Sequence, residues 1–210
     1  MIDFAKELGA IDWKDSLNAY TICDDVIGRA ISGGHAKKLL ASIPHNAELL
    51  KLCEQLQGLK KLVLFDQGDN GVRIRLHLFE QYSFEVAHNH RWSFYSRILR
   101  GNYLQSIHGT ISEKMTAADI ASAEITTILN LGTRQSYFLH HTSIHSLRAE
   151  RSTVSIIVRG PIARKNALWC DLKQKTNWEH LGDKTDTLKR PLTLQEVETT
   201  IHAITDWGIL

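Results

Sequence analysis

The chain has 210 residues, of which 43% are hydrophobic and 23% are charged, and its formal net charge is +2. This length suits one domain with terminal additions, and the composition is that of a globular protein with a sizeable core. The small net charge and the absence of a block of like charges argue against nucleic acid as a partner.

Three further features of the sequence bear on where the protein is located and whether it binds a membrane. No apolar run approaches the roughly twenty residues that a membrane-spanning helix needs, so we expect no membrane partner. The first residues lack the charged and apolar regions of a signal peptide. Cys23, Cys53 and Cys170 are scattered without a C-x-x-C motif, which favours reduced thiols and a cytoplasmic location.

Residues 1–58 are predicted to form a helical N-terminal extension. Apolar residues recur at helical spacing in 15–31, 36–43 and 47–56. Asn46 is positioned to cap the last of these helices. We expect the helices to pack on the outside of the domain that follows or against a second subunit.

Residues 59–176 show the period of two that is typical of β-strands. Ile74, Leu76 and Leu78 alternate with Arg73, Arg75 and His77, which indicates a half-buried strand. Other short strands are predicted at 61–65, 97–107 with a break at Gly101-Asn102, 123–129, 136–139, 144–147 and 153–158. Many short strands at this spacing favour a sandwich or barrel. Residues 177–210 are predicted to be a C-terminal tail with a helix starting at the Thr193–Glu196 capping box.

The sequence His88-Asn89-His90 is the strongest chemical signal in the chain. Alternate residues of a strand share one face, so Phe84, Val86, His88 and His90 would lie together if the strand runs through them. Two imidazoles on one face can converge on a metal ion. His145 is the candidate for a third ligand, with His140 and His141 as the alternatives.

These motifs resemble those of the cupin superfamily. His88-Asn89-His90 and Gly101 match its first motif, whose glutamate is replaced here by Ser93, Phe94 or Tyr95, and His145 matches the second. The resemblance covers about residues 60–170. It implies a mainly β fold, a cupin-type double-stranded β-helix or jelly-roll barrel, here with helical N- and C-terminal extensions.

Loss of the glutamate leaves a three-histidine site, which is similar to that of the thiol dioxygenases such as the cysteine dioxygenase family. That resemblance implies Fe(II). The family's carboxylate-binding arginine aligns near Leu62, and its tyrosine on the last strand is replaced by Arg159. The crosslinking cysteine of some members has no counterpart near Phe94 or Tyr95.

Candidate catalytic residues lie on strands near the predicted ligands. Arg97, Arg100 and Arg159, where they face inward, could hold a substrate carboxylate through a bidentate fork. Tyr95 and Tyr103 could donate a hydrogen bond to bound oxygen or to the substrate.

The sequence thus predicts a non-haem Fe(II) oxygenase that acts on a small anionic molecule bearing a thiol or a carboxylate. Imidazole ligands alone do not choose the metal, so Zn, Ni, Mn and Cu stay open. The alternatives are a cupin that uses a divalent metal as a Lewis acid, for isomerase, hydrolase or lyase chemistry, and a non-catalytic cupin that binds a small molecule. The expected partners are the substrate, O₂ and a second subunit in a homodimer.

Overall fold

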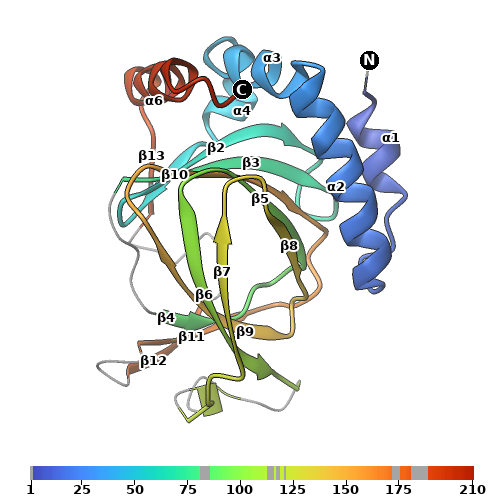
Figure 1. Cartoon of the computed structure of the whole chain (residues 1–210), viewed down its shortest axis with the longest axis vertical. Helices are drawn as coiled ribbons and strands as arrows, with labels where there is room; N and C mark the ends of the chain where they lie inside the picture. Colours follow the sequence, from blue (N-terminus) through green and yellow to red (C-terminus); the bar gives the residue numbers. More distant parts are fainter. Residues whose placement is uncertain are drawn as a thin grey trace.

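The computed structural model of the protein describes residues 2–80, 86–112, 116, 119–120, 122–171, 176–180 and 189–210, with the side chains of 176–180 excepted. Two antiparallel sheets face each other, and helices cover one of them (Figure 1). The predicted fold class, mainly β with helices at both ends of the chain, is therefore confirmed. Among the described residues, no helix is long and apolar enough to cross a membrane.

The described helices lie near the two ends of the chain. They are α1 (Phe4–Gly9), α2 (Ser16–Ser32), α3 (His35–Ser42), the 3₁₀-helix η1 (Ile43–His45), α4 (Ala47–Leu50) and α6 (Leu194–Asp206). The caps predicted at Asn46 and Thr193 are confirmed, and Asp15, predicted as the first residue of its helix, is instead the N-cap. Asp15 and Asn46 accept hydrogen bonds from the first turns of α2 and α4, and Thr193 forms the capping box of α6 with Glu196.

The strands divide between a seven-stranded and a six-stranded sheet. The first has the order β13-β1-β2-β3-β10-β5-β8 and the second β12-β11-β4-β9-β6-β7. The strands are β1 (Glu54–Leu56), β2 (Leu59–Asp66), β3 (Arg73–Phe79), β4 (Val86–His88), β5 (Phe94–Arg100), β6 (Asn102–Thr110), β7 (Thr127–Gly132), β8 (Ser136–Leu139), β9 (Ser143–Ala149), β10 (Thr153–Arg159), β11 (Ala167–Asp171), β12 (Thr176–His180) and β13 (Lys189–Pro191).

The prediction of a helix over 47–56 was wrong beyond Leu50. The chain turns there into β1, which pairs with β2 in a hairpin whose register joins Leu56 to Leu59. The two residues between them, Gln57 and Gly58, have φ values of 43° and 82°. Positive φ at both central residues is the geometry of the tight turn that suits the twist of paired strands.

Gly101 carries the chain from one sheet to the other. β5 belongs to the seven-stranded sheet and β6 to the six-stranded sheet, so the predicted break at Gly101-Asn102 is a corner between layers. Gly101 has a φ of 78°, and a Cβ there would lie 2.3 Å from Thr153 Oγ1. Only glycine fits this corner without displacing β10.

The strand predicted at 123–129 begins later, at Thr127, and runs to Gly132. Its start is set by β6, because the ladder between the two strands begins at Ile107 and Thr127. β11, β12 and β13 were not predicted as strands. β1 lies within residues 1–58 and β13 within 177–210, so both terminal segments contribute a strand to the seven-stranded sheet.

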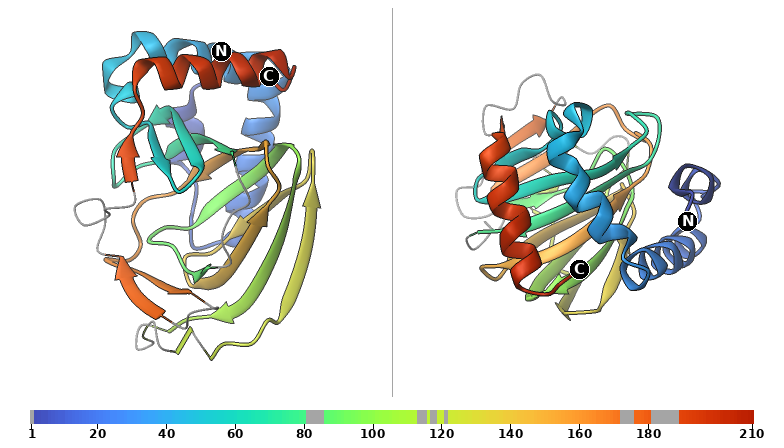
Figure 2. Two further views of the ribbon diagram at one scale, coloured as in Figure 1. Left: turned by 90° about the vertical axis from the view of Figure 1, so that its left-hand side faces the viewer. Right: turned by 90° about the horizontal axis from the view of Figure 1, so that it is seen from above.

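The helices cover the outer face of the seven-stranded sheet. Viewed from above, α3 and α6 run side by side across its strands, with α1 and α2 at one side (Figure 2). The largest apolar cluster lies in this layer and joins Leu40 and Ile27 of the helices to the strands. Ile74, Leu76 and Leu78 of β3 and Val154, Ile156 and Val158 of β10 point into this cluster.

Alternate residues of the same strands therefore point to the interior between the sheets. Arg75, His77 and Phe79 of β3, and Ile157 and Arg159 of β10, line a cavity there. The predicted half-buried strand is thus covered on both faces, and its polar face looks into the molecule rather than toward solvent. This arrangement gives the interior its chemistry.

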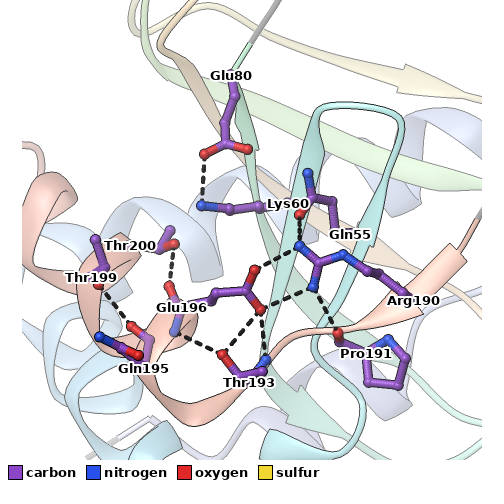
Figure 3. A network of polar contacts seen from close by, with 10 residues as sticks. All are labelled: Gln55, Lys60, Glu80, Arg190, Pro191, Thr193, Gln195, Glu196, Thr199 and Thr200. Atoms are coloured by element: carbon purple, nitrogen blue, oxygen red, sulfur yellow. Dashed lines mark hydrogen bonds and ion pairs between the residues drawn. The ribbon is translucent and has the colours of Figure 1, made fainter.

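A polar network joins β13 to the start of α6 (Figure 3). Arg190 donates to both carboxylate oxygens of Glu196, at 2.6 and 3.0 Å, and to Gln55 on the neighbouring β1. The same carboxylate accepts from the Thr193 backbone N–H. The network sets the direction in which α6 leaves the sheet and crosses its outer face.

Candidate metal centre

Three histidines, from β4, from the segment just after it and from β9, meet at one point. His88 is the last residue of β4 and lies opposite His145 of β9 in the antiparallel ladder. His90 follows two residues after His88. One ring nitrogen from each of the three lies within 4.8 Å of the others, which makes the group a possible metal site.

β4 ends at His88, so His90 lies beyond the strand that was expected to carry it. Phe84, used in the prediction of a shared face, is outside the described residues. The alternation still holds past the strand end, because Asn89 points the other way. Its Nδ2 donates to the His141 carbonyl at 3.2 Å and its Oδ1 accepts from the Leu168 N–H at 2.7 Å.

Hydrogen bonds identify the nitrogens that face the common point. His88 Nδ1 lies 2.9 Å from the Val86 carbonyl, which can only accept, so Nδ1 carries the proton and Nε2 presents a lone pair. His90 Nε2 and His145 Nε2 are 2.9 Å apart. Two ligand atoms at right angles around a metal, each about 2.1 Å from it, are separated by roughly 3 Å. The spacing of this pair fits neighbouring ligands of one ion.

The protonation of the group also fits a metal. Burial lowers the pKa of His88 to about 4. Burial first, and then the neighbouring histidines, lower the pKa of His90 and His145 well below the ordinary value. Neutral imidazoles are the form that binds metal ions. His145 Nδ1 is buried and has no hydrogen-bond partner among the described residues, so the ring is held by packing and by the strand.

Aromatic rings hold two of the three imidazoles in place. Trp169 of β11 stacks on His88 with ring centres 4.4 Å apart and planes at 17°. Phe94 of β5 meets His90 edge-on at 4.8 Å. These contacts restrict ring rotation, and together with Asn89 they support the group from behind.

His140 and His141, the alternative third ligands, are engaged elsewhere. His140 Nδ1 pairs with Thr142 Oγ1 at 2.8 Å, and His141 Nδ1 pairs with Ser93 Oγ at 3.1 Å. Neither belongs to the three-histidine group. Of the candidates weighed from the sequence, the structure brings His145 to His88 and His90.

The group opens into a cavity of about 230 Å³ between the two sheets. Its wall is cationic: among the described residues that line it there is no aspartate or glutamate. The cations that line it are Lys61, Arg75, Arg91, Arg159 and Lys189. Such a wall favours anionic ligands and disfavours cationic ones.

Two of the five candidate catalytic residues line this cavity. Tyr103 is fully buried, and its hydroxyl lies 2.5 Å from Ser155 Oγ. Arg159 is 2% exposed, stacks over Trp92 at 4.9 Å and donates to the carbonyls of Gly68 and Gly160. Burial, with the nearby charges of other arginines, lowers its pKa to about 10.

The other three candidates lie away from the histidines. The Tyr95 hydroxyl donates to Asp24 of α2 at 2.6 Å, and Arg97 lies 3.8 Å from the same carboxylate. Both belong to the face of β5 that packs under the helices, and neither lines the cavity. Arg100 also lies on another surface, 4.8 Å from the Trp207 ring. The parity of β5, which presents Phe94 to the interior, explains the positions of Tyr95 and Arg97, whereas Arg100 follows an irregularity in the pairing of β5 with β10.

Sequence reasoning missed Lys61, Arg75 and His77 as parts of the site. The signal was present as the alternation of β3, but its polar face was assigned to solvent. Lys61 lies opposite His77 in the pairing of β2 with β3, and Arg75 shares their face. Covering helices on the other side turn this polar row inward.

No protein-family model matches the chain, and no curated protein matches it either. Solved structures do. An RmlC-like cupin from Shewanella frigidimarina is 18% identical with a TM-score of 0.40, over 56% of this chain and 89% of that one. KdgF from Halomonas sp. is 11% identical with a TM-score of 0.38, over 50% of this chain and 79% of that one.

Pac13, described as a nucleoside dehydratase and found in Streptomyces, is 11% identical with a TM-score of 0.38, over 68% of this chain and 87% of that one. These likenesses are partial, and they concern the arrangement of strands alone. None of these three proteins is described as a thiol dioxygenase, so that resemblance stays a prediction.

Proposed function

We propose that the protein is a metal-dependent enzyme, a non-haem Fe(II) oxygenase that acts on a small organic acid. The observation that carries the proposal is the convergence of His88, His90 and His145 at a cavity with a cationic wall. Three neutral ligands leave the charge of a divalent ion uncompensated. An anionic group of the substrate would compensate it on binding.

The three histidines would hold Fe(II) through the nitrogens that face their common point. Because three ligands on one side of an octahedral ion leave neighbouring positions open, bound Fe(II) would supply adjacent sites for substrate and O₂. Trp169 and Phe94 keep two of the imidazole planes fixed and exclude water from their far sides.

Tyr103 can donate a hydrogen bond within the cavity. Burial raises its pKa well above the ordinary value, so the phenol stays protonated. Its hydroxyl, next to Ser155 Oγ, can donate a hydrogen bond to an oxygen of the substrate. Arg159 contributes positive charge to the same wall.

Metal analysis of the purified protein, followed by oxygen uptake, tests the proposal. We expect close to one iron per chain and oxygen consumption with at least one member of a panel of thiols and small carboxylic acids. His88→Ala should lose both. His140→Ala is the matched control, because that histidine is nearby and outside the group.

Lewis-acid chemistry is the second candidate, since three imidazoles suit zinc or nickel as well as iron. Bound zinc or nickel, with no oxygen uptake after reconstitution with Fe(II), would overturn the oxygenase proposal in favour of it. A protein that binds none of these metals would overturn both.

A further inference from the structure

β7 forms one edge of the six-stranded sheet. Of the described strands, β6 alone pairs with it. The left view of Figure 2 shows β7, in yellow, as the outermost strand of its sheet. An edge strand exposes backbone N–H and C=O groups with which a further strand can pair.

Two other sheet edges are protected in ways that β7 is not. β13 is three residues long and carries a lysine, an arginine and a proline, which all oppose pairing with another chain. β8 packs against α2, and the Tyr20 hydroxyl of that helix lies 3.0 Å from Ser136 Oγ. β7 contains neither a charged residue nor a proline. An edge strand of this composition is suited to pairing with another strand.

Large apolar side chains are exposed beside this edge. They are Ile128 of β7, which is 61% exposed, Ile125 just before that strand, and Leu104 of β6. The ladder places Ile128 opposite Ser106, two residues from Leu104, so Leu104 and Ile128 share the outer face of the sheet. A single exposed apolar residue is ordinary, but three of them at one uncharged edge indicate a surface that another chain covers.

The charges that flank β7 are complementary in an antiparallel arrangement of two copies. Glu124 precedes the strand and Arg134 follows it, and both are exposed. They lie at equal distances in sequence from Leu129, one on either side. A two-fold axis at Leu129 brings Glu124 of each copy to the end at which Arg134 of the other copy lies. A two-fold contact of this kind is self-complementary and closes as a dimer.

We propose that β7 pairs antiparallel with β7 of a second copy, which joins the six-stranded sheets of two chains into one continuous sheet. Backbone hydrogen bonds then satisfy the edge, the exposed apolar side chains lose contact with water, and a Glu124–Arg134 pair at each end fixes the register. The three-histidine group takes no part in this contact, so the inference is independent of the proposed function.

Sedimentation velocity in a low-salt buffer measures the mass of the assembly. We expect twice 23.8 kDa for the wild type and 23.8 kDa for Ile128→Lys, because the lysine places a charge in the contact. Leu17→Lys is the matched control, since Leu17 lies on α2 and is 75% exposed, and that variant should remain a dimer. A wild type that is monomeric at about 100 μM would overturn the proposal, as would an Ile128→Lys protein that dimerises as tightly as the wild type.

Charge reversal tests the register through two exposed residues. Glu124→Arg and Arg134→Glu should each weaken dimerisation by roughly ten- to thirty-fold, because each places like charges at both ends of the contact. An equimolar mixture of the two variants should recover dimerisation, since their heterodimer has opposite charges at both ends. Glu198→Arg alters an exposed carboxylate on α6 and should have no effect.

A mixture that associates no more tightly than either variant alone would overturn the antiparallel contact. If Ile128→Lys proves unstable, this exchange of charges decides the question alone, because the side chains of Glu124 and Arg134 are exposed and their substitution leaves the core unchanged.

Discussion

His88 on β4 lies directly opposite His145 on β9 in an antiparallel ladder. Side chains that face each other across neighbouring strands are held a few ångströms apart by the backbone itself. Two of the three candidate ligands are therefore set by strand pairing, and His90 is the member that depends on the loop after the strand. The predictions below test this arrangement and what surrounds it.

Removal of any of the three histidines should abolish metal binding without unfolding the protein. We expect His88→Ala and His145→Ala to purify without metal and to keep a β-type circular dichroism spectrum, since the large apolar cluster lies under the helices. A metal present at a hundred times its dissociation constant adds about 2.7 kcal/mol of stability. The wild type should accordingly lose thermal stability when a chelator is added, and the His145→Ala protein should not.

His140→Ala serves as the control and should behave like the wild type in both measurements. Full metal content in the His145→Ala protein would contradict the assignment of the third ligand.

Asn89→Ala should weaken metal binding although Asn89 offers no ligand. Its side chain is fully buried and fastens the segment between His88 and His90 to Leu168 and to the His141 carbonyl. Loss of such supporting hydrogen bonds costs roughly ten- to a hundred-fold in metal affinity. Competition with a chromophoric chelator would measure it.

Asn102→Ala removes an exposed hydrogen bond to Glu150 and is the comparison for Asn89→Ala. If the two variants bind metal equally well, Asn89 has no positioning role.

Glu54 should make the stability of the protein sensitive to acid. Its folded pKa is about 2, because the charges of Lys61, Arg75 and Lys189 outweigh burial, whereas its ordinary value is 4.5. A lowered pKa contributes stability above the unfolded value and loses it as pH falls. The contribution should therefore be complete above pH 4.5 and disappear toward pH 2, by about 3 kcal/mol at 1.36 kcal/mol per pKa unit.

Urea unfolding between pH 2 and pH 7 would measure this dependence for the wild type and Glu54→Gln. The variant should show a shallower dependence on pH. Glu48→Gln alters a carboxylate whose side chain is 78% exposed and should leave the profile unchanged. Parallel profiles for the wild type and Glu54→Gln would contradict the prediction.

Tyr95→Phe should lower the stability of the protein, whereas Tyr103→Phe should lower its turnover. Tyr95→Phe removes the hydrogen bond to Asp24, and we expect it to lower the free energy of unfolding by about 1–3 kcal/mol while metal binding and turnover persist. Tyr103→Phe removes the hydroxyl from the cavity and should lower turnover with metal content unchanged. A fall in turnover for Tyr95→Phe but not for Tyr103→Phe would contradict this assignment and indicate that Tyr95 acts in the site.

The sequence predicts the metal centre better than the substrate pocket, for a local reason. His88 and His90 share a face because side chains alternate along an extended chain, so their spacing of two residues is enough to predict that they lie together. The choice of His145 over His140 and His141 required the ladder between β4 and β9, which joins distant segments. The sequence pattern made His145 a candidate, and the pairing of β4 with β9 separates it from His140 and His141.

Which face of a strand meets the ligand is decided by other elements. Tyr95 and Arg97 were placed in the site, and Lys61 and His77 were left out, because period-2 patterning does not tell helix-covered from cavity-facing sides. The position of α2 over β5 settles the first pair, and the pairing of β2 with β3 settles the second. Likewise, β1 was read as helix because its tight turn depends on positive φ at Gln57, which has no strong signature.

The burial of both faces of the seven-stranded sheet separates two tasks along each strand. On β3, Ile74, Leu76 and Leu78 pack in the apolar cluster under the helices, whereas Arg75 and His77 line the cavity. Substitutions at one set leave the packing of the other set in place. A change of substrate preference can therefore arise one inward position at a time, and directed evolution of this protein can concentrate on those positions at little risk to folding.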